Sequence, residues 1–298
     1  MILPVITVTI LGSACSPKDD LFGSTGSITV VAAFYPVQAA AEAVGGDLVD
    51  VVNLTAPGVE PHDLELTPDA VERIQTADLV LYFGEGFQPA VEDAVSGAEG
   101  VTLDLLAGLP TVAPPASEAQ EGLTVDPHVW LDPALYAAMT DEIEAALAGV
   151  SADDATVFES NARTFEAGLS TLNDDFSAGL ATCSQHLIVT NHAAFGYLAA
   201  AYGLLQEAIS GLAPDAEPSA QRIAQLKDLV EREGVTTIFT EELVAPEVAE
   251  TLANEAGVQT RVLYTLEGLT ADEEAAGADY DSLMRKNLTT LEVALGCS

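Results

Sequence analysis

Two hydrophobic patterns alternate along the chain: short apolar runs, and longer segments in which apolar residues recur every three or four positions. Short apolar runs are typical of buried strands, and the wider spacing is typical of helices with one buried face. In the first half of the chain the patterns predict strands at residues 28–33, 49–54 and 79–83, with helices at 36–44 and 68–76. Strands and helices are therefore expected to alternate.

The same rhythm returns after residue 185. There we expect strands at 186–190, 236–240 and 260–264, and helices at 193–202, 220–232 and 246–255. Such alternation is typical of βαβ units, in which helices cover a buried parallel sheet. The sequence therefore predicts an α/β protein of two lobes, each with a mostly parallel β-sheet flanked by helices.

The segment between these halves, residues 152–181, has no proline, and its apolar residues recur mostly at intervals of three, four or seven. This pattern predicts one amphipathic helix, which would be about 45 Å long and could run across both lobes as a stiff connection. We expect a proline-rich surface loop at 110–121. The expected division is an N-terminal lobe at 27–150, the connecting helix at 151–182 and a C-terminal lobe at 183–298.

The charge balance excludes several classes of partner. The chain has 47 Asp and Glu against 9 Lys and Arg, a formal net charge of −38. Nucleic acids and anionic membrane surfaces are bound mainly through clusters of Lys and Arg, so neither is expected as a partner. With 49% apolar and 19% charged residues the chain can form a packed core. The acidic surface is consistent with a saline habitat, or simply with the absence of an anionic partner.

The first residues are typical of an export signal. Residues 2–14 are apolar and end in small residues before Cys15, after which the chain becomes polar. Small residues before a cysteine are typical of a bacterial lipoprotein signal, in which Cys15 would carry the lipid; a plain cleaved signal and a buried strand are the alternatives. We assign residues 1–26 to the signal and tether. The expected location is outside the cytoplasm, in the periplasm or on the outer face of the cell membrane.

Two further cysteines, Cys183 and Cys297, remain if Cys15 is lipidated. A pair of cysteines in an oxidising compartment is expected to form a disulfide, which here would tie the last helix to the start of a strand. Two unpaired buried thiols are the alternative.

Three of the four histidines occupy similar positions. His62 follows a predicted strand, His128 lies in a loop bracketed by prolines, and His192 lies where a strand turns into a helix. Ligands of open α/β sheets bind beyond the carboxyl ends of strands, so the three imidazoles can point into one cleft between the lobes. Three imidazoles suit Zn²⁺ and related metals. His186 lies at the start of a strand and is expected on the surface.

Four segments resemble the metal-binding lipoproteins of bacterial ABC importers, the zinc- and manganese-uptake solute-binding proteins. They follow the family's order across nearly the whole chain, at residues 61–68, 126–133, 190–198 and 280–288. The resemblance implies two α/β lobes joined by a rigid long helix, with a metal held between them by His62, His128 and His192. It implies Zn²⁺ as bound cargo, because manganese-selective relatives commonly have a carboxylate at the third position, and an ABC permease in the membrane as partner.

The fourth ligand is where the chain departs from that family. Many relatives supply an aspartate from a Leu-Asp-Pro segment of the second lobe, and the comparison with residues 262–267 puts Tyr264 there. The candidates for the fourth position are a water, Glu60, Glu241 and Tyr264 itself.

Carboxylates near the histidines are candidates for a supporting role. A ligating imidazole normally donates its other N–H to a carboxylate or carbonyl, and the nearest candidates in the sequence are Asp63, Asp132 and Glu241. Capping of a helix is the alternative role of the two aspartates. Trp130, the only tryptophan, is expected either to wall the cleft or to pack in the core.

The resemblance favours a monomeric solute-binding protein over an enzyme. Manganese or iron is the nearest alternative cargo. A zinc-dependent hydrolase is the alternative from another class, because three histidines with an open fourth position also occur in catalytic zinc sites. An adhesin with a structural metal is a further possibility.

Overall fold

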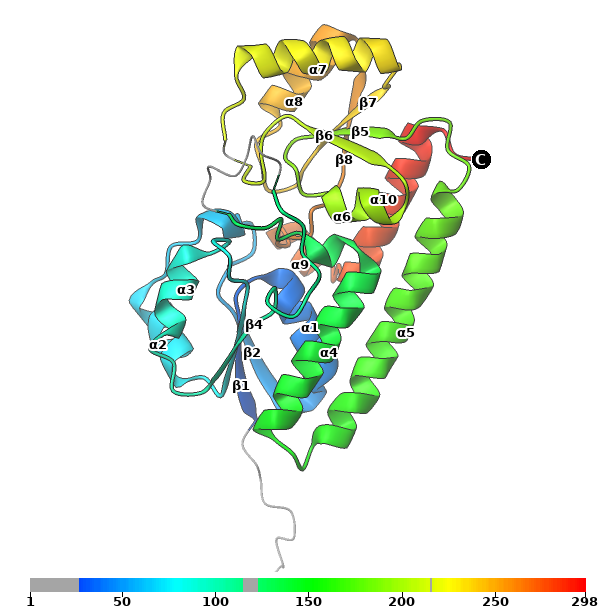
Figure 1. The fold of residues 1–298 in the computed structure, drawn as a ribbon. Helices are drawn as coiled ribbons and strands as arrows, with labels where there is room; N and C mark the ends of the chain where they lie inside the picture. The colour runs from blue at the N-terminus through cyan, green and yellow to red at the C-terminus, as the bar shows by residue number, and fades with distance from the viewer. Residues whose placement is uncertain (1–26, 115–122, 215) are drawn as a thin grey trace, which may run out of the picture.

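The computed structural model describes residues 27–114, 123–214 and 216–298, which form two four-stranded parallel β-sheets flanked by helices (Figure 1). The strand order is β2-β1-β3-β4 in the first sheet and β6-β5-β7-β8 in the second. The predicted α/β fold with two parallel sheets is confirmed. The strands are β1 (Ile28–Ala32), β2 (Val49–Asn53), β3 (Leu79–Tyr82), β4 (Val101–Asp104), β5 (Leu187–Thr190), β6 (Leu205–Ala208), β7 (Thr237–Thr240) and β8 (Gln259–Val262).

Most of the helices begin where the sequence supplies a cap or a proline. Proline lies in the first turn of the first four helices, and Thr67, Asp132, Ser219 and Asp279 accept backbone N–H groups at helix starts. The helices are α1 (Tyr35–Gly45), α2 (Pro68–Thr76), α3 (Pro89–Val95), α4 (Pro133–Val150), α5 (Ala155–Leu180), α6 (Gly196–Ala201), α7 (Ala220–Glu233), α8 (Glu247–Ala256), α9 (Ala271–Ala275) and α10 (Tyr280–Leu295).

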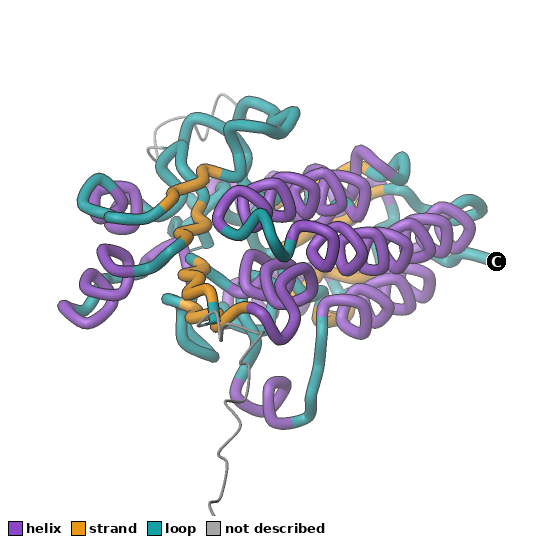
Figure 2. The backbone as a smooth tube through the Cα atoms, turned by 90° about the horizontal axis from the view of Figure 1, so that it is seen from below, coloured by secondary structure: helices purple, strands orange, loops and turns teal. Residues whose placement is uncertain are grey.

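The long helix between the two sheets is α5. It has 26 residues, about 39 Å at the usual rise, and in Figure 1 it runs along one side of the molecule from the first sheet toward the second. Helices α1, α4 and α10 pack against it, and Figure 2 shows long helices side by side along this flank. Its buried residues recur every three, four or seven positions, as the pattern predicted: Phe158, Ala162, Leu169, Leu172, Phe176 and Leu180.

Helix α10 returns from the second sheet to the first half of the chain. The Tyr280 hydroxyl donates to the Trp130 carbonyl at 2.6 Å, and the ring of Tyr280 lies 4.4 Å from that of Tyr136 between centroids. Both Tyr280 and Tyr136 are buried. Residues near the end of the second half therefore complete the core of the first half.

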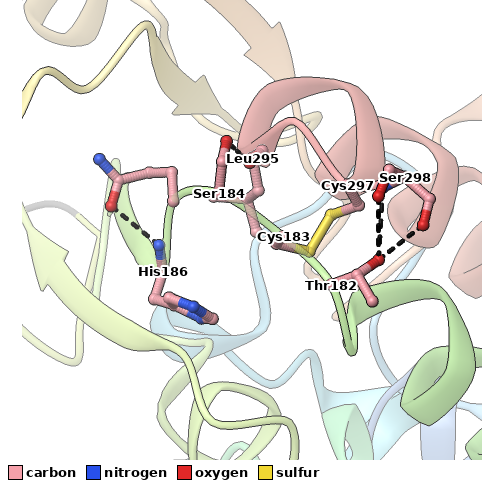
Figure 3. The surroundings of a disulfide bond; sticks show 8 residues. Thr182, Cys183, Ser184, His186, Leu295, Cys297 and Ser298 are labelled. Atoms are coloured by element: carbon pink, nitrogen blue, oxygen red, sulfur yellow. Dashed lines mark hydrogen bonds between the residues drawn. A yellow bond between two sulfur atoms is a disulfide. The ribbon is translucent and has the colours of Figure 1, made fainter.

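A disulfide joins the end of α10 to the segment before β5. Cys183 and Cys297 are bonded across a sequence separation of 114, in the arrangement expected from the sequence (Figure 3). The backbone N–H and hydroxyl of Ser184 both donate to the Leu295 carbonyl, at 3.1 Å each. The two segments are thus linked by hydrogen bonds beside the covalent bond.

Some elements differ from those expected. Strands β4 and β6 and helices α3 and α9 were not predicted. The helix expected from residue 193 begins only at Gly196, and the Ala193 N–H donates to the Gly211 carbonyl. Residues 110–114 of the expected loop have no helix or strand, and its remainder, like the signal segment and Cys15, lies outside the described residues. Within the described ranges, no helix combines the length and apolar character needed to cross a membrane.

Candidate metal centre

Four side chains from both halves of the chain meet where connections leave the carboxyl ends of strands. His62 lies in a 3₁₀ turn (Pro61–Asp63) between β2 and α2, and His128 immediately precedes a 3₁₀ turn (Val129–Leu131) between β4 and α4. His192 follows β5 by two residues, and Glu267 lies in the connection from β8 to α9. Parallel sheets gather such connections at one edge, which explains how residues far apart in the sequence converge.

The four groups form a compact cluster, with one ligand atom from each within 4.8 Å of the others. Glu267 Oε1 lies 3.4 Å from His62 Nε2, 3.1 Å from His128 Nε2 and 3.3 Å from His192 Nε2. The Nε2 atoms of His128 and His192 are 3.3 Å apart. Zinc bonds to nitrogen or oxygen are about 2.0–2.1 Å long, which places the ligand atoms around a tetrahedrally coordinated zinc ion about 3.3 Å apart. The four separations given above therefore suit a cation with tetrahedral coordination.

Two of the imidazoles are held by buried carboxylates. Asp126 Oδ1 accepts the backbone N–H of His128 at 3.0 Å and lies 2.8 Å from its Nδ1. Glu241 does the same for His192, with distances of 2.9 Å to the backbone N and 2.6 Å to Nδ1. A proton held on Nδ1 leaves the lone pair of Nε2 directed at the centre of the cluster. Both imidazoles are thus oriented as metal ligands.

His62 lies in less polar surroundings. The ring of Phe87 meets it edge-on at 4.7 Å between centroids, and Glu60 Oε1 accepts the His62 backbone N–H at 3.3 Å. Burial lowers the pKa of His62. Burial, followed by the negative charge of Glu267, raises the pKa of Glu60 to about 9. His62 is therefore favoured in the neutral form that binds metals.

Glu267 is fully buried at the centre of the cluster. Burial alone would raise its pKa, but the three imidazoles outweigh burial and hold the pKa of Glu267 well below its usual range. Burial would likewise lower the pKa of His192, yet the charges of Glu241 and Glu267 raise it well above its usual value. Without a cation, protons on His128 and His192, whose pKa values are raised, balance the carboxylates. A divalent cation can replace those protons.

Glu267 was not among the candidates for the fourth position. Tyr264 lies outside the cluster, with its backbone N–H and carbonyl bonded to the Asn287 side chain at 2.7 and 2.8 Å. Glu60 and Glu241 contact His62 and His192 from outside the cluster. A signal was present, because a single acidic residue, Glu267, follows the last predicted strand within the stretch 262–270.

The remaining residues singled out from the sequence lie beside the cluster or elsewhere in the structure. Asp132 caps α4 by accepting the Ala134 N–H at 2.8 Å, while Asp126 holds His128. Asp63 lies in the turn with His62. Trp130 is fully buried in the core, with its ring 5.2 Å from that of His128 between centroids. His186 is exposed, as expected for a surface residue.

The family described as zinc-uptake complex component A, periplasmic, matches residues 30–294. The chain is 39% identical over 288 residues to the zinc-binding protein AdcA of Streptococcus pyogenes serotype M1, covering 90% of this chain and 56% of AdcA. It therefore spans little more than half the length of that relative. It is 35% identical over 295 residues to the high-affinity zinc uptake system protein ZnuA of Bacillus subtilis, covering 95% of this chain and 90% of the relative.

Solved structures have the same fold. The Zn(II)-bound ZnuA-like domain of Streptococcus pneumoniae AdcA is 37% identical, with a TM-score of 0.78, and the match covers 91% of this chain and 99% of that domain. The laminin-binding protein Lmb of Streptococcus agalactiae, described as having adhesin and metal-transporting activity, is 27% identical with a TM-score of 0.81, covering 91% of this chain and all of that one.

Proposed function

We propose that this chain, which belongs to the zinc-uptake complex component A family, captures Zn²⁺ outside the cytoplasm and delivers it to an ABC permease. The observation that carries the proposal is the cluster of three imidazoles and one carboxylate, whose ligand atoms all lie within 4.8 Å of one another. The Glu267 oxygen lies 3.1–3.4 Å from each imidazole Nε2, a separation that suits tetrahedral zinc. The proposed ligands are His62, His128, His192 and Glu267. Three nitrogen ligands with one oxygen suit Zn²⁺ better than Mn²⁺, which prefers more oxygen ligands.

The same cluster argues against hydrolysis. A catalytic zinc site has three protein ligands and an open position for water, whereas in the proposed site Glu267 would take the fourth position. The hydrolase hypothesis depended on an open fourth position. A site closed by four protein groups is suited to holding a cargo ion.

We also propose that residues 27–150 and 183–298 act as two lobes connected through α5, with the metal between them. His62 and His128 come from the first lobe, and His192 and Glu267 from the second. Bound zinc would therefore bridge the lobes, and the closed form would be the one that the permease receives.

Membrane anchoring through Cys15 forms part of the proposal. The relative from Streptococcus pneumoniae strain R6, 37% identical over 292 residues, is described as a zinc-binding lipoprotein. We expect the wild-type protein to fractionate with membranes as a monomer, and Cys15→Ser to be released in soluble form. A wild-type protein found free of the membrane would contradict the anchoring.

The central experiment is elemental analysis of the protein purified without added metal, paired with zinc competition titrations. We expect near-stoichiometric zinc, and loss of affinity by orders of magnitude in His192→Ala. His186→Ala is the matched control, because this exposed histidine lies outside the cluster, and its affinity should equal that of the wild type. Co-purified manganese or iron, or equal affinities of the two variants, would overturn the proposal.

A further inference from the structure

Two adjacent glutamates follow β7 and serve different parts of the metal centre. The carboxylate of Glu241 accepts the backbone N–H of His192 and contacts the Nδ1 of the same residue. The Glu242 side chain turns instead to the connection after β8, where Oε2 accepts the Thr265 N–H at 3.3 Å and Oε1 accepts the Leu266 N–H at 3.2 Å. The pair therefore reaches the connections that carry both ligands of the second lobe.

The connection of residues 263–267 is held at successive backbone groups. The Leu263 N–H donates to the Thr240 carbonyl, and the Asn287 side chain bonds both backbone groups of Tyr264. Trp130 Nε1 donates to the Thr265 carbonyl at 2.8 Å. Glu242 accepts the N–H groups of Thr265 and Leu266. Among these contacts it is therefore the one nearest in sequence to Glu267.

The backbone at Leu266 shows why such a contact is needed. Leu266 has φ of +55°, in the left-handed region that residues with a Cβ rarely adopt. This turn directs the next residue, Glu267, at the three imidazoles. Such a conformation persists only where its surroundings impose it, and Glu242 accepts the N–H of Leu266 itself.

A second path leads from the same side chain to the ligand. The Thr265 hydroxyl lies 3.2 Å from Glu267 Oε2 and donates to it, and it lies 3.5 Å from Glu242 Oε1. This leaves Glu267 Oε1, the oxygen nearest all three imidazoles, free to face the metal.

We propose that Glu242 is a positioning residue that sets the orientation of Glu267 for zinc, through the backbone of Thr265 and Leu266 and the Thr265 hydroxyl. This inference rests on the proposed function of the same site. Glu242 touches no metal ligand directly. Its effect is to present the fourth ligand before the ion arrives, so that less ordering is needed on binding.

The test compares zinc affinity and the visible absorption spectrum of the Co²⁺-loaded protein, which reports the number and geometry of the ligands. We expect Glu242→Met to weaken zinc binding about 10–100-fold, the usual effect of losing an outer partner of a ligand. Its Co²⁺ spectrum should shift toward that of Glu267→Gln. Glu242→Gln keeps an acceptor oxygen and should be intermediate. Glu247→Met, at an exposed position of α8, is the control and should match the wild type.

A double-mutant cycle separates positioning from a general loss of structure. If Glu242 acts through Glu267, adding Glu242→Met to Glu267→Gln should reduce affinity little further. Fully additive losses, or a wild-type Co²⁺ spectrum in Glu242→Met, would overturn the inference. Thr265→Val provides a milder variant should Glu242→Met fold poorly, and an unchanged affinity and spectrum there would contradict the second path. A wild-type protein that binds no zinc would instead refute the proposed function.

Discussion

His128 and His192 are held by the same kind of contact, although they come from different halves of the chain. Each has a buried carboxylate that accepts both its backbone N–H and its Nδ1–H, so that the main chain and the ring are oriented by a single group. At His62 the ring of Phe87 packs edge-on against the imidazole, and Glu60 Oε1 accepts the backbone N–H. Orientation by a carboxylate also makes the imidazole a stronger electron donor.

Removing one of these carboxylates should weaken zinc binding without removing a ligand. We expect Asp126→Ala to lower zinc affinity about 10–100-fold, because the His128 ring loses the acceptor that fixes its tautomer. Asp132→Ala is the matched control: it removes the cap of α4, which costs about 1 kcal/mol of folding stability, and should leave affinity unchanged. Competition titrations and denaturant unfolding measure the two effects. Equal affinities in both variants would show that Asp126 does not support the site.

The sequence identified the histidines because each lies in a distinctive local segment next to a predicted strand or helix. Glu267 was missed because its place depends on the left-handed turn at Leu266 and on contacts with Glu242, Asn287 and Trp130. Those contacts come from residues distant in sequence. The one local signal, a single acidic residue after the last predicted strand, does not by itself indicate the three imidazoles that surround Glu267.

At the scale of elements, predictability followed burial only in part. The central strands β1, β3, β5 and β7 are mostly apolar and were predicted, and so were the edge strands β2 and β8. The edge strands β4 and β6, with the mixed sequences Val-Thr-Leu-Asp and Leu-Gln-Glu-Ala, were missed. An edge strand is covered on fewer sides, so it needs no continuous apolar run. The apolar face of α5 could be predicted because its buried residues recur at helical intervals and pack against other helices.

Substitutions on the buried and exposed faces of α5 test how this helix packs. Phe176 is fully buried and stacks on Tyr202 with 5.1 Å between ring centroids. We expect Phe176→Ala to lower the free energy of unfolding by about 3–5 kcal/mol, since it removes a large buried ring and leaves a cavity. Val157→Ala changes a residue of the same helix that is 46% exposed and should stay within about 0.5 kcal/mol of the wild type. Equal unfolding midpoints in denaturant would contradict this assignment of the buried face.

The disulfide is expected to stabilise the fold without affecting the metal centre. Replacing both Cys183 and Cys297 with alanine should lower the free energy of unfolding by about 2–5 kcal/mol, because the bond restricts a long loop of the unfolded chain. Zinc affinity should stay unchanged, since Cys183 precedes β5 and His192 follows it. As a control, a reducing agent should destabilise the wild type and leave the variant unaffected. A loss of zinc affinity in the variant would show that the two regions are coupled.

At the scale of the whole molecule, the two halves repeat one topology and share one site. In both sheets the first strand of the half has the second strand on one side and the third and fourth strands on the other. Each half contributes two of the four clustered groups. Neither half contains all four groups, so under the proposed function zinc affinity would be a property of the assembled pair.

The net charge of −38 should make stability depend on salt. Raising ionic strength from about 0.01 to 1 M shortens the screening length from about 30 to 3 Å, which weakens repulsion among carboxylates held close together in the folded state. We expect the melting temperature of the metal-free protein to rise with sodium or potassium chloride. Sucrose at equal osmolality is the control for solvent effects. A melting temperature that falls or stays constant in salt would contradict the role of self-repulsion.

The return of α10 to the first half determines when the protein can finish folding. Tyr280 completes the packing around Trp130 and Tyr136, which precede it by 150 and 144 positions. While the chain is being synthesised, we therefore expect the helical layer over the first sheet to stay open until residues 280–295 have left the ribosome. If the chain is exported in extended form, as the proposed function requires, this delay would keep the nascent chain competent for export.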